Sequence, residues 1–134
     1  MEASETAKLF IDALEKIAFF WNFYTVTLLA LIGWFVSKKE SSFGPMRWLV
    51  AAGYLIFASM NVFGLWSTYD IAEALQLDLI DQLNESGHLV HTGDALRNLL
   101  SFESRRWLSV GIHVVIGLPM LYFILFHDRR KERE

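Results

Sequence analysis

Asn22, Asn61 and His113 are the side chains within apolar stretches of this chain that could do chemistry. Each lies five or six residues from one end of its stretch, or about 8–9 Å at ~1.5 Å rise per helical residue. The equal depth predicts that the three meet in one polar layer. Such a layer could be a hydrogen-bonded clasp, or a site for a ligand, an ion or a proton. The remaining alternative is that the three face different directions or another subunit.

A second candidate site is formed by His88, His91 and Asp94, which recur every three residues. On a continuous helix they would share a face, and imidazole with carboxylate could bind Zn²⁺ or another divalent ion. Gly93 interrupts such a helix, so the pattern favours a solvated loop over a metal site. A related alternative is a metal or cofactor site that also recruits His113.

Several classes of chemistry have no support in the sequence. The chain has no cysteine, so it forms no disulfide and offers no thiolate ligand or nucleophile. It has no HExxH, GxSxG or P-loop motif, and its stretches hold no pair of histidines at a depth suited to haem. No basic aromatic surface suggests nucleic-acid binding. The sequence therefore assigns no cofactor and no catalytic residue, and it leans away from an enzyme.

The elements that would carry these residues are three apolar stretches at about 17–37, 47–67 and 107–127. Each has about 20 residues without Asp, Glu or Lys, enough for a helix to cross the ~30 Å hydrocarbon core of a bilayer. In lipid a helix satisfies its own backbone hydrogen bonds. The sequence predicts an all-α, integral membrane bundle of three transmembrane helices, forming a single membrane domain over 1–134. The tryptophans fall near the ends of the stretches: Trp21, Trp34, Trp48, Trp66 and Trp107.

Small and hydrogen-bonding residues recur on one side of each expected helix. Such stripes are typical of helix–helix seams in membranes, because they allow close backbone approach and interhelical hydrogen bonds. The seam residues are Thr25 and Gly33 in the first stretch, Tyr54 and Thr68 in the second, and Ser109 and Gly117 in the third.

The segment 68–106 is too long for a turn and contains seven acidic residues. Residues 70–85 have helical periodicity, which predicts either an extension of the second span or a short amphipathic helix lying over the bundle. A second short helix is expected at 95–102. The acidic polar face favours packing on protein over adsorption to anionic lipid.

Basic residues are unevenly distributed between the connecting segments. Segments 38–47 and 128–134 hold seven Lys and Arg in 17 residues, whereas 1–16 and 68–106 hold five in 55. The positive-inside rule then places the C-terminus in the cytoplasm, and the N-terminus and the acidic segment outside, in a plasma or bacterial inner membrane. The acidic start lacks a basic n-region, so the first stretch is expected to be retained.

The leading functional hypothesis is a non-enzymatic membrane subunit. It would contact the bilayer and assemble with itself or with other membrane subunits through its small and polar seams and its acidic outer segment. A homo-oligomeric channel or small-solute transporter is the alternative, with the same stripes lining a pathway.

Overall fold

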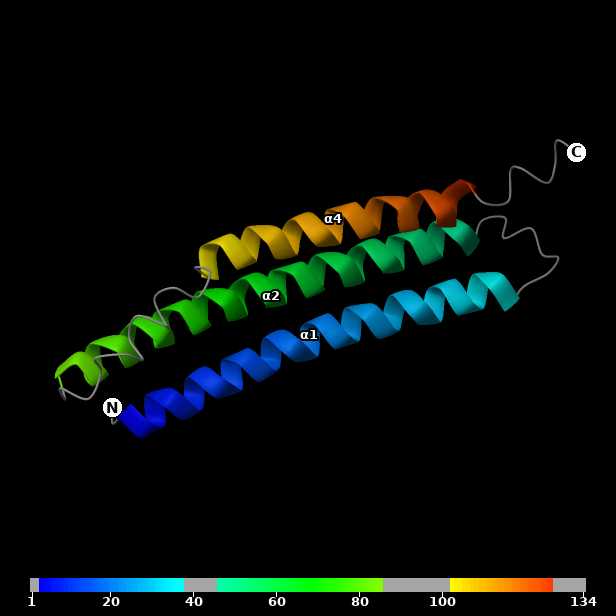
Figure 1. Cartoon of the computed structure of the whole chain (residues 1–134). Coiled ribbons are helices and arrows are strands. Elements are labelled where there is room, and N and C mark those ends of the chain that lie inside the picture. Colours follow the sequence, from blue (N-terminus) through cyan, green and yellow to red (C-terminus); the bar gives the residue numbers. More distant parts are fainter. Residues whose placement is uncertain (1–2, 38–45, 86–101, 127–134) are drawn as a thin grey trace, which may run out of the picture.

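The computed structural model describes residues 3–37, 46–85 and 102–126, and all of them are helical (Figure 1). Helix α1 spans Ala3–Ser37, α2 spans Met46–Glu85 and α4 spans Phe102–Phe126. Each helix is long and apolar enough to cross a membrane. This confirms the predicted all-α fold with three candidate spans, which is the architecture of an integral membrane protein.

Threonine hydroxyl groups in and next to the spans bond to their own helix, which suits an apolar solvent. Thr25 and Thr27 on α1 each donate to the carbonyl oxygen four residues earlier, at 2.9 Å. Thr68 on α2 donates to Gly64 in the same way at 2.7 Å. Since these bonds satisfy the hydroxyl locally, threonine enters an apolar helix at little expense.

Helix α2 lies between the other two and runs antiparallel to both, so α1 and α4 are parallel (Figure 1). Within the described helices, no Cα atom of α1 comes within 8 Å of one of α4. Aromatic rings fill the space between these two helices. Ring centroids lie 5.5 Å apart for Phe35 and Phe123, and 6.1 Å apart for Phe10 and Phe102. The two flanking helices therefore meet through side chains, with α2 as their common support.

Helices α1 and α2 are longer than a bilayer requires. They contain 35 and 40 residues, or about 52 and 60 Å of helix, against ~30 Å of hydrocarbon. The excess is residues 3–16 of α1 paired with 68–85 of α2, which we call the paired extension. In it, the Thr6 hydroxyl donates to Gln82 at 3.2 Å. Residues 70–85 thus continue the second span, and a separate short helix there is ruled out. Most of the helix expected at 95–102 lies outside the described residues.

Two apolar clusters hold the helices together. One lies where the paired extension meets the start of α4, and the other lies toward the opposite end of the bundle. The first cluster contains Ala13, Leu65, Tyr69, Ala72 and Phe102. The second contains Tyr24, Leu28, Phe35, Ala51, Tyr54, Met120 and Ile124. Asn61 and His113, which are buried and polar, lie between these clusters.

Candidate functional site

Asn61 on α2 is bonded to both neighbouring helices. Its side chain is only 3% exposed. The amide nitrogen donates to the backbone carbonyl of Phe20 on α1 at 3.1 Å. The amide oxygen lies 3.0 Å from Nε2 of His113 on α4. One side chain therefore links all three helices inside the span region.

His113 is enclosed by polar atoms at its edge and by aromatic rings on its flanks. It is 5% exposed, and its Nδ1 lies 2.8 Å from the carbonyl oxygen of Ser109. The ring centroid of Tyr24 lies 4.1 Å away at an interplanar angle of 38°. The ring centroid of Trp21 lies 4.9 Å away at 45°. Both aromatic residues belong to α1, so their side chains contact α4 where the two backbones stay apart.

A pair of tyrosines lies next to the Asn61–His113 contact. The hydroxyl oxygens of Tyr24 and Tyr54 lie 3.3 Å apart and are buried. Gly117 on α4 makes this approach possible, because a Cβ there would lie 3.2 Å from the Tyr54 oxygen and 3.8 Å from the Tyr24 oxygen. We call Tyr24, Tyr54, Asn61 and His113 the polar cluster.

A groove between α2 and α4 borders the polar cluster and has a volume of about 630 Å³. Its lining comes from these two helices, without a contribution from α1, and is almost wholly apolar. The polar side-chain atoms of the lining belong to His113, Tyr54 and Ser59, and to the indole nitrogen of Trp66. The groove gives one side of the polar cluster an opening toward the surroundings of the bundle.

Asn22 does not join the polar layer predicted for it. Its side chain is exposed on α1 and has no hydrogen bond to any described residue. The helical repeat explains this outcome, because Asn22 lies about 160° around α1 from the buried Tyr24. Asn22 was expected at the depth of the Asn61–His113 contact. At this depth, however, α1 faces the other helices with aromatic rings and the Phe20 carbonyl.

The other predicted seam residues divide by helix. Thr25 and Gly33 share the exposed side of α1 with Asn22, and no atom would lie within 4 Å of a Cβ on Gly33. These two residues form no seam between the described helices of this chain, and their place in a seam with another chain stays a prediction. On α2 and α4 the seam residues lie at helix contacts or are buried: Tyr54, Thr68, Ser109 and Gly117.

One buried hydroxyl in this region is unused. The Ser109 Oγ has no hydrogen-bond partner among the described residues, although its carbonyl accepts from His113. Buried polar atoms without a partner are uncommon in folded proteins. Ser109 thus contributes its backbone, and not its side chain, to the cluster.

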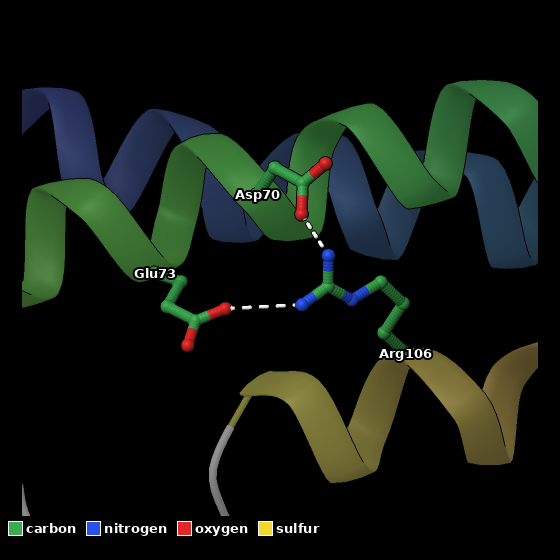
Figure 2. A network of polar contacts seen from close by, with 3 residues as sticks. All are labelled: Asp70, Glu73 and Arg106. Atoms are coloured by element: carbon green, nitrogen blue, oxygen red, sulfur yellow. Dashed lines mark hydrogen bonds and ion pairs between the residues drawn. The ribbon is translucent and has the colours of Figure 1, made fainter.

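An ion cluster lies where α4 begins, and sequence reasoning missed it. Figure 2 shows the Arg106 guanidinium between the carboxylates of Asp70 and Glu73, one turn apart on α2. The distance to Glu73 is 3.3 Å, and the guanidinium carbon lies 4.9 Å from the ring centroid of Trp66. Trp66 in turn meets Trp107 edge to face at 5.1 Å. The available signal was an acid pair spaced i, i+3 and an Arg beside a boundary tryptophan.

The proposed metal ligands His88, His91 and Asp94 lie outside the described residues. The hypothesis of a metal site there stays a prediction. Within the described helices, no group of three or more His, Asp or Glu side chains is placed to hold a metal ion.

Comparison of the chain with protein-family models, with curated proteins and with solved structures finds no match.

Proposed function

We propose that this chain is a non-enzymatic membrane subunit that assembles with itself or with other membrane subunits. The observation that carries the proposal is the exposed side of α1. There the small and polar residues Asn22, Thr25 and Gly33 recur along the helix with Leu29 between them, and all four are exposed. We call these four residues the exterior stripe.

The exterior stripe is a poor surface for lipid and a good one for another helix. An amide facing hydrocarbon without a hydrogen bond is unfavourable by a few kcal/mol, on the order of the 1–3 seen in proteins. Gly33 has open space beside it, so a second backbone could approach closely. Close approach and interhelical hydrogen bonds are what stabilise helix pairs in membranes. A neighbouring helix on this stripe would supply both.

The paired extension supports a docking role outside the membrane. Its α2 half, residues 68–85, has five acidic residues and no Lys or Arg. Arg106 from α4 engages Asp70 and Glu73. Asp78, Asp81 and Glu85 are exposed beyond this ion cluster. A basic surface on a partner would complement this charge and would be attracted to it at moderate salt.

Cysteine cross-linking in native membranes tests the exterior stripe, since the chain has no cysteine of its own. We expect Thr25→Cys and Gly33→Cys to form disulfide-linked dimers under mild oxidation if the chain self-assembles. Phe23→Cys is the matched control, because Phe23 is 49% exposed at nearly the depth of Thr25 but lies about 160° around the helix from Thr25 and about 80° from Gly33.

The native mass of the detergent-extracted protein completes the test. Stripe-specific cross-links with a multimeric mass support self-assembly, and co-purifying chains lost in Asn22→Leu support a hetero-complex. A monomeric mass with no preference for stripe positions would overturn the proposal. A closed ring with an open axis would favour the channel alternative.

We also propose that the C-terminus is cytoplasmic and that the paired extension lies on the opposite side, in a plasma or bacterial inner membrane. The support is the basic content of segments 38–47 and 128–134. Reporters fused after Glu134 should be active only in the cytoplasm. Activity confined to the outside would reverse the orientation.

A further inference from the structure

We propose that His113 is a proton-binding site within the membrane-spanning bundle, and that loss of its second ring proton turns the Asn61 amide and breaks the bond from α2 to α1. This inference is independent of the proposed assembly role, because it depends on the polar cluster and not on the exterior stripe.

Both ring nitrogens of His113 face oxygen atoms that can only accept. Nδ1 lies 2.8 Å from the Ser109 carbonyl oxygen, and Nε2 lies 3.0 Å from the Asn61 amide oxygen. A neutral imidazole carries one N–H, so one of these contacts would set two lone pairs against each other. The imidazolium has two N–H groups and donates to both oxygens.

The Asn61 amide is held in this orientation by another helix. Its nitrogen donates to the Phe20 carbonyl at 3.1 Å, which leaves its oxygen toward His113. If the amide turned over, its nitrogen could donate to a neutral His113, but its oxygen would then face the Phe20 carbonyl. The neutral ring is therefore accommodated only when the hydrogen bond to α1 is given up.

Two aromatic rings of α1 lie beside the imidazole ring of His113. The centroids of Tyr24 and Trp21 lie 4.1 and 4.9 Å from it, within the ~6 Å over which an aromatic ring attracts a cation. No described carboxylate, lysine or arginine contacts His113. The titratable groups facing it are Tyr24 from α1 and Tyr54 from α2. Arg106, two turns away on α4, is engaged by Asp70 and Glu73.

His113 is part of the lining of the groove between α2 and α4, so the buried ring borders an opening in the bundle. The Ser109 hydroxyl, which has no partner among the described residues, lies one turn away on the same helix. A hydroxyl can both donate and accept a hydrogen bond. The ring is therefore next to an opening of the bundle while all three helices stay in place.

The consequence is a link between the proton and the attachment of α1. With the proton bound, one amide joins α1, α2 and α4. With the proton lost, the bond from Asn61 to Phe20 is broken and α1 keeps the aromatic contacts and the tyrosine pair. Titration of His113 would therefore weaken the attachment of α1 and leave the contact between α2 and α4 intact.

Nitrogen NMR of the imidazole ring tests the proposal directly. Full-length protein in lipid nanodiscs would carry His88→Gln, His91→Gln and His127→Gln, so that His113 is its one histidine. These three positions lie outside the described helices. Between about pH 5 and 8, the range in which histidine titrates, the ring nitrogens report whether one or two are protonated. We expect the doubly protonated ring at the acid end of the range.

The proposal further requires that the neutral ring appear only together with a change in the Asn61 side-chain amide resonance. In Asn61→Leu we expect loss of most of the doubly protonated signal at the same pH. Ser59→Ala is the matched control, because Ser59 lines the groove on the same helix and is exposed. It should leave the signal unchanged.

Three results would overturn these claims. A singly protonated ring at the acid end, or a doubly protonated fraction that Asn61→Leu does not alter, would remove the proton site. An Asn61 amide that stays fixed while the ring loses its proton would remove the link to α1. A ring that keeps both protons to the alkaline end would support the site and overturn the release of α1 in this range.

Discussion

Nε2 of His113 on α4 lies 3.0 Å from Oδ1 of Asn61 on α2, and the far end of the same amide donates to the Phe20 carbonyl on α1. The backbones of α1 and α4 stay apart, so this contact and the aromatic rings beside it connect α1 with α4 between the two apolar clusters.

Replacing Asn61 with leucine should destabilise the bundle by about 1–3 kcal/mol, because interhelical hydrogen bonds in membranes average ~0.6 and reach ~1.7 kcal/mol each. The measurement is reversible unfolding in mixed micelles. Met60→Leu is the control, since Met60 is 69% exposed on the same helix. Equal stability of the two variants would show that Asn61 does not hold the helices together.

Gly64→Ala should destabilise the protein by about 1–3 kcal/mol through overpacking. A Cβ on Gly64 would lie 2.5 Å from Cζ of Phe20, so the Phe20 ring would have to move. That movement would disturb the residue whose carbonyl accepts from Asn61.

Gly53→Ala is the comparison for Gly64→Ala on the same helix. No atom lies within 4 Å of a Cβ on Gly53. Alanine should there leave stability unchanged or raise it by up to about 1 kcal/mol, the difference in helix propensity. The unfolding midpoints should separate the two alanine variants, and coincident midpoints would contradict the packing described for Phe20.

Gly117→Ala should be harmful only while Tyr54 keeps its hydroxyl, because a Cβ on Gly117 would lie 3.2 Å from that oxygen. We expect a loss of about 1 kcal/mol in the wild-type background, at the lower end of the range for overpacking. The loss should shrink in Tyr54→Phe. A double-mutant cycle measures this coupling, and strictly additive effects would place the tyrosine hydroxyl away from Gly117.

The ion pair between Arg106 and Asp70 should contribute about 0.2–1 kcal/mol, since the Asp70 side chain is half exposed and solvent screens it. The double-mutant cycle of Arg106→Gln with Asp70→Asn gives this coupling energy. It should fall as salt is raised. A coupling that is insensitive to salt would indicate that packing of Arg106 on Trp66 dominates instead.

Ser109→Ala should be neutral or raise the thermal midpoint, unlike most buried substitutions. The Ser109 hydroxyl is buried without a described partner, whereas the carbonyl that His113 uses is retained in alanine. Removing an unsatisfied polar atom relieves a penalty of up to about 1–3 kcal/mol. A lowered midpoint would reveal a bond that this hydroxyl makes in the membrane.

The candidate site could be predicted only in part. Depth along a helix follows from counting residues, so Asn61 and His113 were expected at the same level and are found in contact. Direction around α1 does not follow, because this span is apolar on nearly every side and hydropathy marks no inner face. Asn22 therefore lies at the expected depth but on the side of α1 that faces away from the bundle. The aromatic neighbours of His113 were not predicted.

By itself the sequence determined the number of spans and the all-α class, because lipid imposes a local rule of apolar length and internal backbone bonding. Only the tertiary structure decided which polar groups meet, that α2 continues to Glu85, and that Arg106 lies between Asp70 and Glu73. These depend on rotation and packing of whole helices against one another. Trp21 and Tyr24 pack around His113, so α1 turns its aromatic side to the bundle and Asn22 faces away from it.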